Sequence, residues 1–310
     1  MKITLFGAES LGVRGLSCLV ETRDRRIFID PGIALGFVRH GLPPHPFQVL
    51  MGAMIRAKML AALKTATDVV MSHFHGDHVP LLEANPYQMR LDLAVDAMRR
   101  ARIFCPGTTE VSGAMPRRRA DLEQALGQSI ADAGNKTDGD MTFSAPVPHG
   151  LAGGNQGSVM MTRIADQGTT FVHASDIQLL DSATVDALLD WRPDMVLVSG
   201  PPLYLKRLAP ALLRQARDNA VRLARRTPVL ILDHHLLRCP EGLNWLRSLR
   251  KMTEHRVLCA AEFMGRAPCL LEAWRAELYR DLPVPTGWHE AYARGVADTS
   301  GFRHWREWSV

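Results

Sequence analysis

The string His-Phe-His-Gly-Asp-His at residues 73–78 constrains this chain more than any other feature. Four side chains that bind metals fall within six positions, directly after the apolar run Val69-Val70-Met71. A β-strand that ends in such a cluster delivers three imidazoles and a carboxylate to one point in space. Neutral imidazole together with carboxylate suits zinc, iron or manganese rather than calcium. The string therefore predicts a metal site, unless it is a polar loop with incidental histidines.

Further histidines and aspartates follow apolar runs that are typical of β-strands. Asp30 closes the run Arg26–Ile29 and precedes the turn signal Pro31-Gly32. The same kind of position, just beyond a strand-like run, is occupied by His149, Asp176, His234 and His235. Layered α/β folds place functional side chains in the loops beyond strand ends, where they converge on a cleft. We therefore expect these residues to meet the 73–78 string at one site.

The order Asp, HxHxDH, His, Asp, His resembles the metallo-β-lactamase superfamily over roughly residues 1–265. More narrowly, the stretches FGAESLGVRG, IDPGIALG with GLPPHP, and LDHHLLR are similar to an uncharacterised prokaryotic branch of predicted metal-dependent hydrolases. The resemblance implies an α/β fold, a four-layer αββα sandwich of metallo-β-lactamase type, with residues 1–265 as the catalytic domain.

The resemblance also implies two divalent metal ions, most simply zinc, with manganese or iron as alternatives. One ion would be held by His73, His75 and His149, the other by Asp77, His78 and His234, with Asp176 as the bridge. A two-metal site of this kind suits hydrolysis of an ester, because a bound water then becomes a nucleophile near neutral pH.

Catalytic roles are expected for Asp77, Asp30 and His235. Asp30 would orient ligand imidazoles, or would cap the turn before Pro31. His234 and His235 are adjacent and should project to opposite faces, so one of them is the metal ligand. The position of His234, one polar residue after the strand, favours it as the ligand. His235 would then take part in substrate binding or proton transfer, or would be a buried structural residue.

Composition is typical of a globular enzyme. With 310 residues, 46% of them hydrophobic, the chain can bury a large core in one or two domains. Charged residues interrupt the apolar stretch 47–66, so no membrane association is expected. The N-terminus reads as a strand rather than a signal peptide. Five cysteines without a CxxC pair indicate reduced thiols and a cytoplasmic location.

The expected elements alternate along the chain. An antiparallel meander of three strands should come first, over residues 2–6, 16–22 and 26–30. A helix over 46–65 should follow it and precede the metal-binding strand. Residues 86–140 predict a helical insertion, either a lid or a substrate-binding element. The second half repeats strands and helices, so that two sheets pack together. Residues 266–310 predict a helix over 270–280, followed by a Trp-rich tail. The tail should dock on the domain or on a partner subunit, and in the second case the protein would be a homo-oligomer.

The charge balance bears on the substrate. The formal net charge is +5, with basic clusters that either form solvated helix faces or attract a phosphate-rich ligand. We expect a hydrolase acting on a phosphodiester, either RNA or a small phosphorylated metabolite. Alternatives are a carboxylic ester, thioester or lactone hydrolase, and an iron-dependent oxidoreductase. The insertion 86–140 lacks the Gly-Pro-rich arm expected of ribonucleases in this superfamily, which weakens the RNA interpretation.

Overall fold

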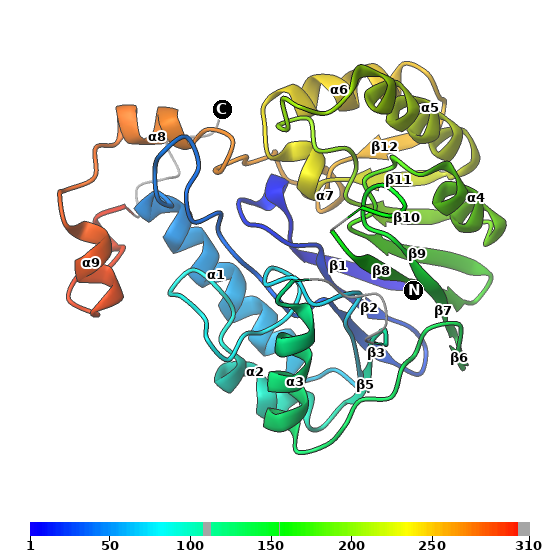
Figure 1. The fold of residues 1–310 in the computed structure, drawn as a ribbon, viewed down its shortest axis with the longest axis horizontal. Coiled ribbons are helices and arrows are strands. Elements are labelled where there is room, and N and C mark those ends of the chain that lie inside the picture. The colour runs from blue at the N-terminus through cyan, green and yellow to red at the C-terminus, as the bar shows by residue number, and fades with distance from the viewer. Residues whose placement is uncertain (108–112, 155, 303–310) are drawn as a thin grey trace.

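The computed structural model describes residues 1–107, 113–154 and 156–302 (Figure 1). A five-stranded sheet and a seven-stranded sheet pack against each other, and helices cover their outer faces. One continuous cluster of buried hydrophobic residues draws on both sheets. The predicted four-layer αββα sandwich is therefore confirmed.

The first sheet has the order β1-β2-β3-β4-β5. Its first three strands form the predicted antiparallel meander, and β4 and β5 continue parallel to β3. The central strands are buried on both faces, which explains their continuous apolar sequences. The strand bounds are Lys2–Gly7 for β1, Ser17–Glu21 for β2, Arg26–Ile29 for β3, Asp68–Val70 for β4 and Arg102–Phe104 for β5.

The second sheet has the order β12-β11-β10-β9-β8-β7-β6. Strands β9 to β12 are parallel, whereas β6, β7 and β8 join by antiparallel pairing. The bounds are Thr137–Asp138 for β6, Met141–Pro148 for β7, Ser158–Asp166 for β8, Thr169–Ser175 for β9, Met195–Val198 for β10, Val229–Leu232 for β11 and Arg256–Leu258 for β12.

The direction of the strands positions the site. Strands β3 and β4 are parallel, as are β9, β10 and β11. Strand β7 runs in the same sense as β9, because both are antiparallel to β8. The carboxyl ends of these strands therefore meet at one edge of each sheet, and the loops that follow them carry the predicted site residues.

Separate sets of helices cover the two sheets (Figure 1). The first sheet is covered by α1 (Pro46–Leu63), α2 (Leu91–Met98) and α3 (Met115–Leu126), the second by α4 (Ser182–Asp190), α5 (Pro210–Arg226) and α6 (Glu241–Arg250). Residues 86–140 thus supply two of these helices and also the edge strand β5. His45 caps α1, since its Nδ1 accepts a hydrogen bond from the Phe47 amide at 3.1 Å.

Helix α1 is the one helix of the described residues that is long and apolar enough to cross a membrane. One such helix is weak evidence, because core helices pass the same test. Its residues Val49, Ile55, Met59 and Leu63 are buried in the protein core. The cytoplasmic location stays a prediction.

The C-terminal segment contains the short helices α7 (Ala260–Phe263), α8 (Arg275–Asp281) and α9 (Trp288–Ala293). The predicted helix over 270–280 begins only at Arg275, because tertiary bonds fix the preceding turn. Glu272 pairs with Arg14 there, and Arg275 donates to the Leu42 carbonyl and to Gln48. Of the predicted Trp-rich tail, Trp288 is buried, whereas Trp305 and Trp308 lie outside the described residues.

Candidate metal centre

Asp176, just beyond β9, lies at the centre of the predicted site. Its Oδ2 is 3.1 Å from His149 Nε2 and 3.7 Å from His73 Nε2. The same oxygen is 3.4 Å from the Nε2 atoms of His234 and His235. Ring nitrogens from the ends of β4, β7 and β11 therefore converge on one buried carboxylate.

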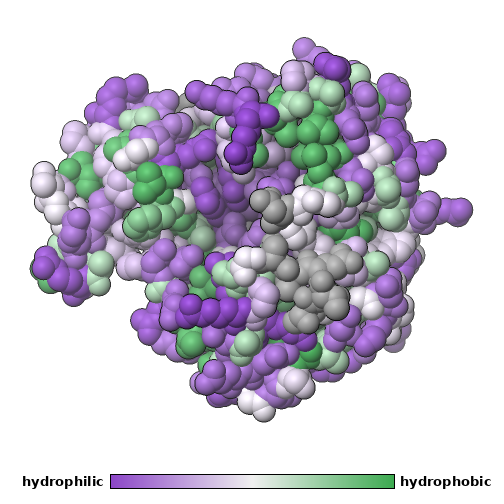
Figure 2. All heavy atoms as spheres, in the orientation of Figure 1, coloured by the Kyte–Doolittle hydropathy of each residue, from purple (hydrophilic) through white to green (hydrophobic). Residues whose placement is uncertain are grey.

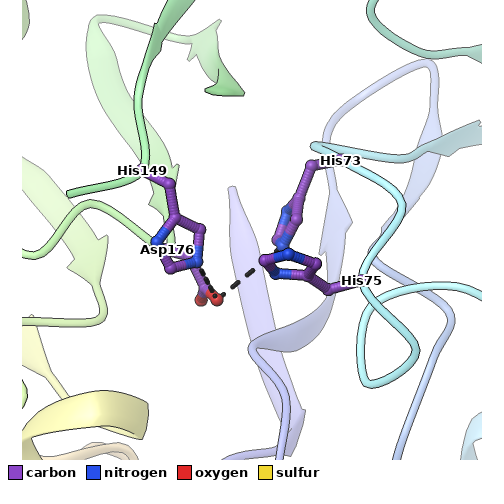
Figure 3. Close-up of side chains that lie close together, drawn as sticks. All are labelled: His73, His75, His149 and Asp176. Carbon is purple, nitrogen blue, oxygen red and sulfur yellow. Dashed lines mark hydrogen bonds and ion pairs between the residues drawn. The ribbon is translucent and has the colours of Figure 1, made fainter. Parts of the chain in front are cut away.

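Within the described residues, possible metal donors form four overlapping groups, two of which are Asp30, His73 and His78, and Asp176, His234 and His235. The first-metal group is His73, His75, His149 and Asp176, whose donor atoms lie within 4.8 Å of one another (Figure 3). The second-metal group is Asp77, His78 and His234, with the same spacing. His78 Nε2 is 3.3 Å from Asp176 Oδ1, which links this group to the shared carboxylate. The first-metal and second-metal groups contain the same residues as the two ligand sets implied by the resemblance.

Hydrogen bonds on Nδ1 orient several of these rings. Ser72 donates from Oγ to Asp30 at 2.7 Å, so this oxygen can accept from His73 Nδ1, which lies 2.9 Å away. Asp30 also accepts from Nδ1 of His78 at 2.8 Å. The Gln178 amide lies 3.2 Å from His149 Nδ1. Asp30 thus has the ring-orienting position predicted for it, and it also receives the Ser72 backbone N–H at 2.7 Å.

Several buried donor atoms in this cluster have no hydrogen-bond partner within the described residues. They are the Nε2 atoms of His73, His78 and His235, together with Oδ1 of Asp176. Buried polar atoms are nearly always paired, so a set of lone pairs facing a common centre calls for another partner. Imidazoles whose Nδ1 is engaged while Nε2 is free are typical metal ligands. The residues present therefore fit divalent metal ions.

Electrostatics keep the donors in the protonation states that metals require. Burial lowers the pKa of His75 to about 4 and holds that of His73 well below its ordinary value. Burial alone would raise the pKa of Asp77 and Asp176, yet the neighbouring histidines hold both well below the usual range. His78 is different: burial lowers its pKa, but the charges of Asp176 and Asp30 outweigh this and raise it. Metal binding at His78 must therefore displace a proton.

The backbone at the site is strained at three strand ends. Asp30, Ser175 and His234 have φ values of 51°, 54° and 43°, in the left-handed region that non-glycine residues rarely adopt. Gly32 allows the Asp30 turn to pack tightly on the metal string (residues 73–78). A Cβ there would lie 2.2 Å from the Val79 amide nitrogen. Strain that tertiary structure maintains at converging strand ends is typical of functional sites.

Tyr204 is a residue that the sequence interpretation did not place beside the ligands. Tyr204 Oη is 2.8 Å from His235 Nδ1. Glu9 accepts from Arg238 Nε at 3.0 Å, and Nη2 of the same arginine reaches His234 Nε2 at 2.7 Å. Arg238 is thus buried within a charged network. Tyr204 lies beyond the Pro201-Pro202 turn that follows β10, and no local sequence pattern marks it as a site residue.

Most of the basic clusters form ion pairs away from the metal string. Arg102 pairs with Asp68 and Asp138, and Arg222 pairs with Asp186. Arg118 differs, because it is half-buried and donates to the Phe74 carbonyl at 3.0 Å. Figure 2 shows a hollow lined by hydrophilic residues near the middle of the face that it presents.

No family model matches the chain. Individual relatives match it nearly from end to end. The chain is 46% identical over 303 residues to a UPF0282 protein of Methanosarcina mazei, an alignment that covers 97% of this chain and 99% of the relative. It is 33% identical over 302 residues to a UPF0282 protein of Pyrococcus abyssi, covering 93% and 97% of the two chains.

Solved structures resemble the chain at much lower identity. A mutant of the CmlA β-hydroxylase is similar with a TM-score of 0.48 and 12% identity, over 83% of this chain and 51% of that one. A metal-dependent hydrolase of the β-lactamase superfamily is similar with a TM-score of 0.47 and 12% identity, over 83% and 94% of the two chains.

Proposed function

The chain belongs to the UPF0282 family, and from the geometry of its side chains we propose that it is a metal-dependent hydrolase with a binuclear centre that cleaves a phosphodiester. One observation carries the proposal. Asp176 contacts donors that come from strand ends in both sheets, and within each group the donor atoms lie within 4.8 Å of one another. Two divalent ions that share a carboxylate are the arrangement used by two-metal hydrolases.

The chain's own residues would hold and orient the reaction. When bound, divalent ions supply a nucleophile from water near neutral pH and stabilise negative charge on the attacked ester. The first-metal group would hold one ion and the second-metal group the other. Asp30 fixes the His78 ring through its Nδ1. Asp77 stays ionised at neutral pH, because the histidines around it lower its pKa.

Two half-buried arginines favour an anionic substrate. Arg118 reaches the metal string from α3, and Arg39 donates to the Arg238 carbonyl at 2.9 Å on the side of β11. Burial lowers the pKa of Arg118, which indicates a guanidinium incompletely compensated by its surroundings. Positive charge on both sides of the donors suits a phosphodiester, in RNA or in a small phosphorylated metabolite, better than a neutral ester.

The test begins with metal content, measured by elemental mass spectrometry on protein purified without added metal. We expect close to two divalent ions per chain, most simply zinc. Hydrolysis of bis(p-nitrophenyl) phosphate is then compared with hydrolysis of p-nitrophenyl acetate and of a homoserine lactone. Faster turnover of the phosphodiester supports the proposal. Faster turnover of the acetate or the lactone would show instead that the substrate is a neutral ester. Iron as the main metal, together with oxygen consumption, would indicate an oxidoreductase instead.

A matched pair of arginine variants tests the substrate charge. Arg118→Ala should raise KM for the phosphodiester while leaving the metal content unchanged. Arg117→Ala is the control, because the neighbouring Arg117 is exposed and pairs with Glu83 at 2.7 Å. Equal kinetics in the two variants would remove the support that Arg118 gives to an anionic substrate.

A further inference from the structure

His235 has the features of a metal ligand, although the superfamily pattern reserves the last position for one histidine. Its side chain is 8% exposed, and its Nε2 is 3.4 Å from Asp176 Oδ2. This atom has no hydrogen-bond partner in the described part of the chain. His149 directs its own Nε2 at the same carboxylate oxygen, and the two rings lie 5.3 Å apart. The donor atoms of His235, Asp176 and His234 also lie within 4.8 Å of one another, a spacing that allows a shared metal ion.

Tyr204 fixes the orientation of the His235 ring. Its Oη lies 2.8 Å from His235 Nδ1 and accepts from Arg238 Nη1 at 3.4 Å. A phenol oxygen that accepts from a guanidinium has a second lone pair available for the Nδ1–H of a neutral imidazole. The Tyr204 and His235 rings are also stacked, at 6.1 Å and 19°. In the tautomer with the proton on Nδ1, this bond leaves the lone pair of Nε2 available to a metal ion.

The same pattern holds two other imidazoles of the cluster. Asp30 engages Nδ1 of His78, and Ser72 engages Nδ1 of His73, while each Nε2 is buried, faces Asp176 and makes no hydrogen bond within the described residues. His234 differs, because its Nδ1 faces the Gly15 amide at 3.3 Å and its Nε2 faces Arg238. In having Nδ1 bound to an orienting side chain, His235 resembles His73 and His78 more closely than His234 does.

We propose that His235 is a metal ligand additional to the seven residues of the superfamily pattern, and that Tyr204 is its positioning residue. The inference rests on the proposed metal centre. The donor atoms of His235, Asp176 and His234 lie within 4.8 Å of one another, so His235 would add a protein donor to the ion that His234 helps to hold. An additional donor favours a metal that prefers octahedral geometry, such as iron, manganese or cobalt. A tetrahedral zinc site has room for fewer.

The experiment uses the full chain loaded with Co²⁺, whose visible spectrum reports coordination number, together with the dissociation constant for Co²⁺. The wild type should show the weak absorption of a five- or six-coordinate ion. His235→Ala should give the stronger bands of lower coordination. Tyr204→Phe keeps the ring and removes only the hydroxyl, and should weaken Co²⁺ binding by about 10- to 100-fold, as loss of an orienting partner does. His255→Ala, at an exposed histidine outside the site, is the matched control.

The outcomes separate this inference from the proposed function. If the wild type binds Co²⁺ while His235→Ala and Tyr204→Phe keep its spectrum and dissociation constant, His235 is no ligand and the metal centre stands without it. If the wild type itself binds no metal, both proposals fail. Should His235→Ala not fold, Tyr204→Phe alone decides, because it leaves the packing of the ring intact.

Discussion

The first-metal group contains Asp176, and His78 and His234 of the second-metal group contact the same carboxylate, yet the surroundings of the two groups differ in charge. Ser72 and Gln178, which are neutral, orient the histidines of the first group. The second group lies against the buried guanidinium of Arg238, whose Nη2 is 2.7 Å from His234 Nε2 and 3.3 Å from Asp77 Oδ2. The first-metal group therefore has only neutral orienting partners. In the second-metal group, Arg238 already contacts two of the three donors, Asp77 and His234.

This difference sets an order of metal affinity. A guanidinium beside a divalent ion repels it, and in a partly desolvated site such repulsion amounts to several kcal/mol. Glu9 offsets part of the charge, because it pairs with Arg238 at 3.0 Å. The second metal should consequently bind more weakly and leave first when a chelator is added. The first-metal group would then determine whether the protein carries metal at all.

The largest expected effect comes from His75→Ala, compared with His234→Ala. His75 belongs to the first-metal group, so its loss should abolish metal binding and activity together, on the order of 1,000-fold or ~4 kcal/mol in rate. His234→Ala should keep one metal ion per chain. Elemental analysis and kinetics of the two variants check this, and equal metal loss in both would contradict the order of affinity.

Asp176→Ala should have the next largest effect, because this carboxylate contacts both groups. The weaker second metal should be lost most clearly, while the three histidines of the first group retain part of the first. Metal stoichiometry measured at increasing chelator concentration shows the order of loss. Unchanged stoichiometry in this variant would end the assignment of Asp176 as the bridge.

Arg238→Met should have a smaller effect and the opposite sign. The variant keeps an unbranched side chain of similar length and removes the charge beside Asp77 and His234. The second metal should bind about tenfold more tightly, or ~1.4 kcal/mol. Isothermal titration with Zn²⁺ measures both steps. The double variant with Glu9→Gln is the control, since Glu9 would otherwise be left buried without its cation.

The sequence predicted the donors better than their surroundings. The metal string places its ligands within six positions, and Asp30, His149 and Asp176 each follow a strand that apolar residues reveal. These residues could be predicted because apolar runs reveal the strands, and because the carboxyl ends of parallel strands lie at one edge of a sheet. The contact of Arg238 with Glu9 joins residues 229 positions apart, and no local pattern encodes it.

Other features escaped prediction because tertiary contacts override local preference. Tyr204 lies beyond the Pro-Pro turn after β10, and the path of that turn decides whether its hydroxyl reaches His235. The predicted helix over 270–280 starts late, because Glu272 and Arg275 bond to distant residues. The periodicity of apolar residues carries no information about such long-range polar contacts.

The last prediction concerns Glu272, which should leave the metal groups unaffected and change stability alone. Burial would raise the pKa of this carboxyl, but the charge and hydrogen bonds of Arg14 lower it from 4.5 to about 2. A carboxyl with a lowered pKa in the folded state contributes stability in full above pH 4.5, and the contribution disappears as the pH falls towards 2. A shift of this size corresponds to about 3 kcal/mol.

Glu272→Gln should therefore lower the free energy of unfolding by about that amount at pH 7, and by progressively less between pH 4.5 and pH 2. Urea unfolding of the wild type and the variant at matched pH isolates this contribution, because the metal-site carboxylates are common to both proteins. Metal stoichiometry at pH 7 should stay the same. A loss of the second metal in Glu272→Gln would mean that Arg14 and Glu272 help to hold Arg238, and the charge difference between the two groups would then extend to the C-terminal segment.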